Sequence, residues 1–291
     1  MTSFGVMFRR DFAPELLPDF ARRTEAAGFD ELWVVEDLGF HGGFSQCAVA
    51  LAVTESLKVG LGIAPAVVRN TAFMAMEWAT TARLFPGRFH MGLGHGVDFW
   101  IEQVGETPAS WLASLEEITV SAKRLVAGES VTLDGRHVHL KNVTLVHPVR
   151  GEQPSVSFGV RQAKSIALAA RTADGVILAE CSGPAYVAET RAAIGQTSRL
   201  TVFIYATPDV AAARAELDIR ISQGRFASQM RIYEGIDVDL YTELLISGET
   251  STWLDQSQQW IEAGADAIVW VPLMTESADA LEMFIRALDG R

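Results

Sequence analysis

Residues 14–37, PELLPDFARRTEAAGFDELWVVED, contain one helix followed by one strand, and they decide the fold class. Proline and acidic residues come early in this segment, and Gly28 follows the helical pattern directly, which is the usual order of helix start and stop signals. The run LWVV at 32–35 is continuously apolar, which is typical of a strand buried on both faces. The segment therefore predicts a helix over residues 14–27 that leads into a strand of a parallel sheet.

The same unit recurs along the chain. Small-residue turns precede later strands at 173–175 (ADG) and 263–266 (AGAD). Apolar runs bounded by turn or charged residues lie at 4–8, 32–35, 59–64, 89–93, 156–160, 175–179, 200–205 and 267–271. Alternating strands and helices indicate a parallel sheet with right-handed crossovers. About eight such units close a (β/α)8 TIM barrel, which we expect here, and a doubly wound open sheet with fewer strands is the alternative.

Two segments depart from the repeating unit. Residues 129–147 alternate apolar and polar side chains around Asp134-Gly135, which predicts an inserted β-hairpin with a tight turn. Residues 223–248, between the seventh and eighth strands, have no clear period and predict a helical or irregular insertion of the kind that often serves as a lid. No linker separates a second domain, so we expect residues 1–291 to form one barrel domain.

The composition excludes several classes of protein. The 291 residues carry 24 Lys and Arg against 36 Asp and Glu, a formal net charge of −12, and 49% of them are hydrophobic. This hydrophobic fraction excludes a disordered chain, and the acidic balance argues against nucleic acid or an anionic membrane as a partner. Two cysteines are too few for a disulfide framework, and no apolar stretch has the form of a signal peptide or membrane span. We expect a cytoplasmic globular protein.

Carboxylates and a histidine follow two of the predicted strands. In a barrel, the active site lies at the carboxyl ends of the strands, which also marks Glu180 and Tyr205 as strand-end positions. Glu36 and Asp37 directly follow the second strand, and we expect one of the two to serve as an acid or base. His95 follows the fourth strand between two glycines, where a flat ligand can approach the backbone and the imidazole can contact it.

A further strand end suits an anion. The residues at 158–162, FGVRQ, end the fifth strand immediately before a helix that contains Lys164. Backbone N–H groups at a helix start, together with Arg161 and Lys164, form an anion site. This pattern predicts a phosphate-bearing ligand. By contrast, His137 and His139 lack acidic or cysteine partners at a metal-ligand spacing, so we expect no metal.

Residues 71–85 predict a helix that is apolar nearly all round, with Glu77 and Arg83 as its charges. On the outside of a barrel such a helix favours a subunit interface, and Met74 and Trp78 are its candidate anchors. We therefore expect a homodimer through this helix. A barrel helix that is merely well covered is the alternative.

Several segments together resemble the bacterial-luciferase-like family of flavin- or deazaflavin-dependent (β/α)8 oxidoreductases. They are AAGFDELWVVED (26–37), the block at 54–96 from TESLKVGLGIAP to FHMGLGHG, WIEQVG (100–105), SLEEITVSAKRLVAGESVTLDGRHV (114–138) and ADGVILAE (173–180). The resemblance covers residues 4–195 and, more loosely, the C-terminal third. WIEQVG and the following hairpin are most similar to the branch named after coenzyme F420-dependent methylenetetrahydromethanopterin reductase. The resemblance implies an F420-dependent oxidoreductase that transfers a hydride between the deazaflavin C5 and a small organic substrate.

The resemblance also implies roles for individual residues. It implies a bulge that backs the cofactor ring at the end of the third strand, with a non-proline cis peptide bond between Gly62 and Ile63. The implied cofactor-binding residues are Gly62, Ile63, Ala64, Gly94, Gly96, Phe158, Gly159, Val160, Arg161 and Gln162. The expected catalytic residues are Glu36, Asp37, His95 and Trp100.

Two positions depart from named branches of the family. The second strand ends in Glu36-Asp37, where the glucose-6-phosphate dehydrogenases of the family carry Asp-His. Met7 stands where the methanopterin reductases carry a glutamate. The resemblance therefore implies a different substrate pocket, for which the candidates are Phe8, Arg9, Asp37, Asp98 and Trp100.

Two other functions remain as alternatives. One is an FMN-dependent monooxygenase of the same fold, in which reduced flavin activates oxygen. The other is a non-catalytic flavin-fold binding protein, whose mark would be a filled cleft. The glycine-rich ends of the third and fourth strands argue against this last alternative, because they are expected to keep space open.

Overall fold

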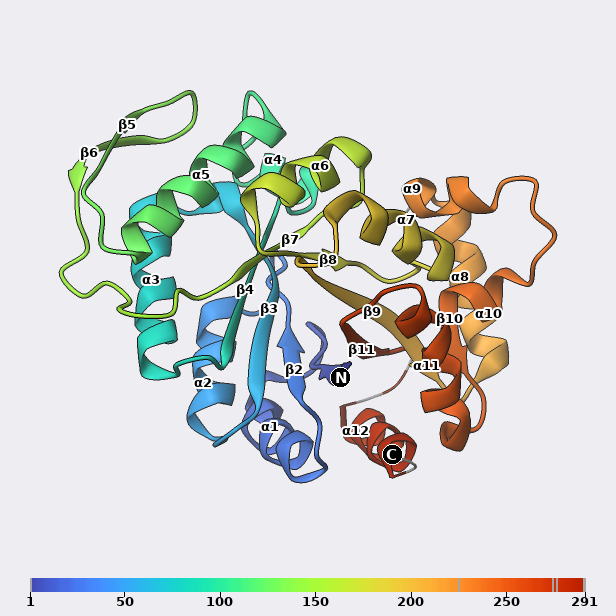
Figure 1. The fold of residues 1–291 in the computed structure, drawn as a ribbon. Coiled ribbons are helices and arrows are strands. Elements are labelled where there is room, and N and C mark those ends of the chain that lie inside the picture. Colours follow the sequence, from blue (N-terminus) through green and yellow to red (C-terminus); the bar gives the residue numbers. More distant parts are fainter. Residues whose placement is uncertain (1, 225, 274, 276, 290–291) are drawn as a thin grey trace.

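The computed structural model of the chain describes residues 2–224, 226–273, 275 and 277–289. Its barrel strands are β1 (Ser3–Met7), β2 (Glu31–Val34), β3 (Lys58–Pro65), β4 (Phe89–Gly94), β7 (Val156–Gly159), β8 (Gly175–Leu178), β9 (Arg199–Thr207) and β11 (Ala267–Pro272). They pair in parallel in the order β9-β11-β1-β2-β3-β4-β7-β8, and β8 pairs with β9 to close the ring. Helices surround this ring (Figure 1). The expected (β/α)8 TIM barrel is confirmed.

The helices begin and end near the predicted signals. The main ones are α1 (Leu17–Ala26), α2 (Gly43–Ala52), α3 (Thr71–Leu84), α4 (Asp98–Gln103), α5 (Trp111–Val126), α6 (Ala163–Thr172), α7 (Pro184–Ile194), α8 (Val210–Ser222), α11 (Trp253–Glu262) and α12 (Ser277–Leu288). The predicted helix over 14–27 is divided into a 3-10 turn (Pro14–Leu16) and α1. The division falls next to Pro18, which lies in the first turn of α1 and has no N–H to donate to a preceding turn. In the part of the chain that the structure describes, no helix combines the length and apolar character needed to cross a membrane.

The core has two layers, one on each face of the barrel wall. The inner layer fills the barrel with side chains such as Met7, Trp33 and Phe203. The outer layer lies between strands and helices and includes Trp78 and Trp270. Because both faces of each strand are buried, the strands are continuously apolar in sequence.

The inserted hairpin is confirmed, but its turn is longer than predicted. Strands β5 (Val131–Asp134) and β6 (His139–Val143) pair antiparallel, with Asp134 opposite His139, so residues 135–138 form the connection. The Glu117 carboxylate of α5 accepts hydrogen bonds from the backbone N–H groups of residues 136, 137 and 138 at 3.1, 2.8 and 3.1 Å. Burial alone would raise the pKa of Glu117, but these three hydrogen bonds outweigh it and lower the pKa. The carboxylate thus stabilises a wide turn in place of the predicted tight one.

The predicted insertion at 223–248 is present between β9 and β11, on the opposite side of the barrel from the hairpin (Figure 1). It contains α9 (Ala227–Met230), a 3-10 turn (Arg231–Tyr233), α10 (Leu240–Leu244) and β10 (Leu245–Ser247). Strand β10 pairs with β9 outside the ring and is too short to produce a period in the sequence. Phe226 and Tyr233 pack into the inner core. The function of the insertion as a lid stays a prediction.

Helix α3 matches the predicted apolar helix, but the predicted anchors are wrong. Met74 and Trp78 are both 0% exposed and belong to the outer core. The exposed apolar side chains of this helix are instead Phe73 and Leu84, each 66% exposed, and Met76. An all-round apolar pattern does not reveal which face turns outward, since both faces read alike in sequence.

Candidate active site at the barrel mouth

The end of β3 carries the expected irregularity. The Gly62–Ile63 peptide bond is cis, and the register between β3 and β4 shifts between Leu61 and Ala64. A Cβ added to Gly62 would lie 2.7 Å from Phe203 Cζ and 2.9 Å from Trp33 Cε3. The expectation that the glycines keep this space open is therefore wrong at Gly62, because the Phe203 and Trp33 rings occupy it.

The Ile63 side chain explains two further glycines. A Cβ on Gly159 would lie 2.5 Å from Ile63 Cγ2, and one on Gly94 would lie 3.1 Å from Ile63 Cδ1. The bulge thus brings Ile63 over the ends of the two following barrel strands. This arrangement joins the predicted ring-backing residues to the predicted phosphate segment.

The two carboxylates after β2 separate. Glu36 forms a 2.5 Å ion pair with Arg69, whose guanidinium also lies 3.2 Å from Glu77 of α3 and 5.3 Å from the Phe44 ring of α2. Phe44 belongs to the outer core, so Glu36 is turned towards the surrounding helices. The structure gives Glu36 an ion-pair role there. Asp37 is the carboxylate of the pair that remains at the mouth.

Arg10 brings Asp37 and Trp100 together, although it was not among the predicted catalytic residues. Arg10, from the loop after β1, donates from Nη1 to Asp37 Oδ2 at 2.6 Å. Its guanidinium also lies 4.8 Å from the Phe40 ring centroid and 5.3 Å from that of Trp100. One arginine therefore holds together the loops that follow β1, β2 and β4.

His95 lies near the start of α6. Its Nε2 is 3.5 Å from Ser165 Oγ in the first turn of α6, and its ring packs edge-on against Trp111 at 5.8 Å. Burial lowers the pKa of His95, and the nearby Asp98 carboxylate opposes this effect. The neutral imidazole is thereby favoured, and the structure groups it with the predicted phosphate end of the site.

The predicted anion segment leads directly into α6. Helix α6 begins after Gln162 without a side-chain cap, so the N–H groups of its first turn have no capping side chain. Arg161, Gln162 and Lys164 are exposed beside it. Phe158 and Val160 are buried in the outer core, so at most their backbone can contact a ligand. This donor set suits a phosphate group.

Of the predicted substrate-pocket residues after β1, one is misplaced. Phe8 is fully buried in the outer core, with its ring 5.4 Å from Phe12 and 5.3 Å from Phe20, because it points away from the barrel interior. Arg9 lies at the mouth, where it donates to both Asp11 carboxylate oxygens and to the Pro272 carbonyl.

Two strand ends carry polar groups to which the sequence gave no role. Glu180, after β8, is half-buried, and burial raises its pKa. Tyr205, near the end of β9, accepts a 2.7 Å hydrogen bond from Arg220 Nη1 of α8. Their positions at strand ends were the one feature of the sequence that pointed to them. The partner of Tyr205, Arg220, comes from another element and was not visible in the sequence.

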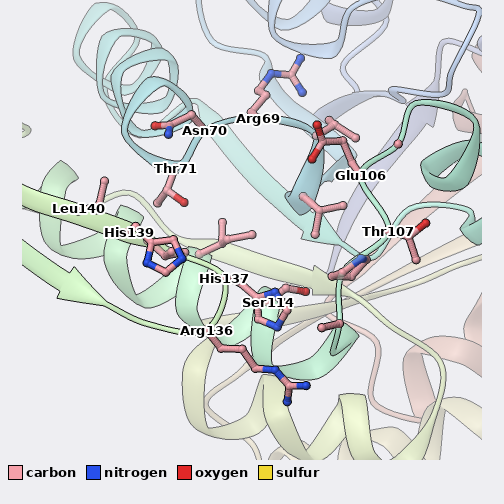
Figure 2. Close-up of a pocket in the computed structure, with 17 residues that line it drawn as sticks. Arg69, Asn70, Thr71, Glu106, Thr107, Ser114, Arg136, His137, His139 and Leu140 are labelled. Atoms are coloured by element: carbon pink, nitrogen blue, oxygen red, sulfur yellow. The ribbon is translucent and has the colours of Figure 1, made fainter.

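A cavity of about 510 Å³ borders the loops that follow β3 and β4 (Figure 2). Asn70 and Thr71 at the start of α3 and the hairpin residues Arg136, His137 and His139 line it, as Figure 2 shows. None of the predicted catalytic or cofactor-binding residues lies in its wall. Within the described residues no group of three His, Cys, Asp or Glu side chains converges as a metal site. The candidate site is thus at the mouth, beside this hollow.

Comparison with known sequences identifies relatives. Residues 5–242 match the family model of the luciferase-like monooxygenases. A 5,10-methylenetetrahydromethanopterin reductase of Methanolobus tindarius is 26% identical over 176 residues, which cover 60% of this chain and 53% of that protein. An F420-dependent glucose-6-phosphate dehydrogenase of Kineococcus radiotolerans is 28% identical over 192 residues, which cover 62% of this chain and 56% of that protein. The matched region spans about half the length of these curated relatives.

Comparison with solved structures gives the same architecture. An F420-dependent secondary alcohol dehydrogenase in complex with an F420–acetone adduct superimposes with a TM-score of 0.81 at 17% identity, over 99% of this chain and 98% of that chain. At this identity the likeness shows the shared barrel fold alone. The family match, by contrast, covers most of the sequence, so the chain belongs to the luciferase-like monooxygenase family of enzymes.

Proposed function

We propose that the protein is an F420-dependent oxidoreductase that transfers a hydride to or from a small organic substrate. The observation that carries the proposal is the uncapped start of α6, with Arg161 and Lys164, next to the Gly62–Ile63 bulge. This arrangement offers donors for a phosphate and an adjoining backbone surface for a flat ring. The F420-dependent relative from Kineococcus supports the same cofactor.

Each part of the mouth has a distinct role in this proposal. When bound, F420 supplies hydride chemistry at C5 of its deazaflavin ring. The segment from Gly62 to Ala64 backs the ring, and the first turn of α6 with Arg161 holds the phosphate. The neutral imidazole of His95 can form a hydrogen bond with the phosphate end of the ligand. Asp37 and Trp100, held by Arg10, border the substrate.

Arg161→Ala tests the anion site directly. The variant is expected to weaken F420 binding by roughly 1–3 kcal/mol, because a charge-assisted hydrogen bond to the phosphate is lost. Fluorescence titration of F420 measures the change. Arg171→Ala is the matched control, since Arg171 lies in the last turn of α6, away from the helix start, and pairs with Glu116. Unchanged affinity in the Arg161 variant removes this residue from the site, and an absence of F420 binding by the wild type contradicts the proposed function.

An FMN-dependent monooxygenase is the second candidate, because the family model that matches this chain is named for monooxygenases. The phosphate donors at α6 suit FMN as well as F420. Parallel titrations with FMN and F420 separate the candidates, together with oxygen consumption by the protein loaded with reduced FMN.

We also propose a homodimer through α3. Phe73 and Met76 are exposed apolar side chains on this helix, and an exposed apolar face of this kind favours association. The wild type is expected to sediment as a dimer at micromolar concentration, and the double variant Phe73→Glu, Met76→Glu as a monomer with an unchanged melting temperature. A monomeric wild type contradicts the dimer.

A further inference from the structure

We propose that a second cavity, at the end of the barrel opposite the mouth, binds an aromatic carboxylate between Arg83 and Arg150. This site is separate from the proposed F420 site, and the inference does not depend on the proposed function. It follows from the place of the cavity in the fold, from its unpaired positive charges and from its apolar lining.

The cavity, which we call the floor cavity, has a volume of about 640 Å³. Its wall comes from three segments, which are the end of α3 with the turn after it (between residues 82 and 87), the start of β4 at Phe89 and His90, and the loop before β7 (between residues 149 and 155). These segments lie at the amino ends of their strands, whereas the active site of a barrel lies at the carboxyl ends. The floor cavity is therefore separate from the mouth, and its volume is typical of cavities that hold small organic ligands.

Two arginines in this wall are unpaired. Arg83, in the last turn of α3, and Arg150, in the loop before β7, are exposed. Neither forms a hydrogen bond, ion pair or ring contact with any residue that the structure describes, although the chain has a formal net charge of −12. The helix dipole favours a basic residue at a helix C-terminus, which accounts for Arg83 but not for Arg150. The two guanidinium groups are thus available to an anion in the cavity.

The loop that carries Arg150 is fixed from two sides. The backbone N–H of Val149, which is buried, donates to the Val126 carbonyl at the end of α5 at 2.9 Å. Gln153 Nε2 donates to the carbonyls of Val149 and Gly151 at 3.4 and 3.1 Å. Because the loop is ordered in this way before a ligand arrives, binding has a smaller entropic cost.

The same wall offers apolar surface. Phe85, Pro86 and Pro154 line the cavity. The Arg88 guanidinium lies 5.8 Å from the centroid of the half-buried Phe85 ring, and Arg88 Nε donates to the Leu57 carbonyl at 3.0 Å. The Phe85 ring is thus supported from one side while the residue borders the cavity. An aromatic ligand can pack against these side chains.

The net charge of the wall favours a monoanion. Besides the two arginines, its ionisable residues are Glu152 and His90. Glu152 has no ion-pair partner among the described residues and contributes one negative charge, whereas burial lowers the pKa of His90 to about 4 and leaves it neutral at pH 7. The wall therefore carries one net positive charge. A carboxylate matches this charge and can accept two parallel hydrogen bonds from a guanidinium, while a phosphate dianion would bring a second negative charge close to Glu152.

The hollow beside the mouth does not offer the same combination. In its wall, Arg69 already pairs with Glu36, and His139 pairs with Asp134. An anion at these two side chains would have to compete with carboxylates of the protein. The floor cavity is thus the better site for a free carboxylate.

A matched pair of probes tests the ligand class. 2-Naphthoate and 2-naphthamide share the ring system and differ in charge, and isothermal titration calorimetry of the apo protein measures their binding. Naphthoate is expected to bind with a Kd below about 1 mM, and the amide at least about 10-fold more weakly. F420 should not displace naphthoate, because the two sites lie at opposite ends of the barrel. Absence of naphthoate binding, equal binding of the amide, or displacement by F420 overturns the inference. Failure of the protein to bind F420 contradicts the proposed function alone.

Arg83→Ala and Arg150→Ala test the two contacts separately. Each variant is expected to bind naphthoate about 10-fold or more weakly and to keep its melting temperature, since both side chains are exposed. Glu152→Gln should tighten naphthoate binding by about threefold, because it removes a like charge. Arg214→Ala is the matched control, since Arg214 is exposed, pairs with Asp239 and lies on α8, across the barrel from α3 (Figure 1). Naphthoate affinity that is unchanged in either of the first two variants, or equally reduced in the control, overturns the inference.

Discussion

Gly92→Ala is expected to destabilise the barrel by about 3 kcal/mol or more. A Cβ at this position would lie 2.2 Å from the Leu61 carbonyl oxygen and 2.8 Å from Ile177 Cδ1. The oxygen belongs to the backbone of β3, so no side-chain rotation relieves the contact. Strands β3 and β4 would have to separate where the bulge begins, and the ring-backing surface would move with them.

Urea denaturation of the apo protein measures this effect, and F420 titration measures its consequence for the site. Gly42→Ala is the control with the same chemical change, since its nearest neighbour is Ser45 Oγ at 3.3 Å and its φ of −69° suits alanine. The control should cost less than about 1 kcal/mol, the effect of replacing glycine at a helix N-cap. A Gly92 variant as stable as this control would contradict the close packing of β3 on β4.

The barrel could be predicted because its strands are buried on both faces. Runs such as residues 32–35 and 267–271 are continuously apolar. The strands observed there, Glu31–Val34 and Ala267–Pro272, begin and end within one residue of the predicted bounds. The turn of the hairpin was mispredicted because its conformation depends on Glu117, which lies on another element.

The same double burial explains why parts of the site were not predictable. Along a continuously apolar strand the alternation of side chains leaves no trace in the sequence. Glu36 and Asp37 therefore read alike, although one pairs with Arg69 on the outer side and the other with Arg10 at the mouth. The hydrogen bond from Arg220 to Tyr205 was also hidden, since it joins two different elements, α8 and β9.

Glu31 lies at the start of β2, at the end of the barrel opposite the mouth. Glu31→Gln is expected to lower the free energy of unfolding by about 3 kcal/mol, because it breaks a buried ion pair. Glu31 is 0% exposed, and its carboxylate pairs with Arg199 and accepts a 2.9 Å hydrogen bond from Trp33 Nε1. The ring of His90 stacks on Trp33 with an interplanar angle of 8°, and burial lowers the pKa of His90 to about 4. At neutral pH the histidine is uncharged, so Arg199 is the cation that balances Glu31.

The Glu31 variant also connects stability to the site. Glu31 orients Trp33, and the Trp33 ring occupies the space beside Gly62, so loss of the carboxylate should loosen the inner side of the bulge. We therefore expect a lower urea midpoint together with weaker F420 binding. Glu282→Gln, in an exposed pair with Arg23, should change stability by less than about 1 kcal/mol and leave F420 affinity unchanged. A Glu31 variant that loses stability but binds F420 normally would separate this network from the site and restrict its role to the barrel floor.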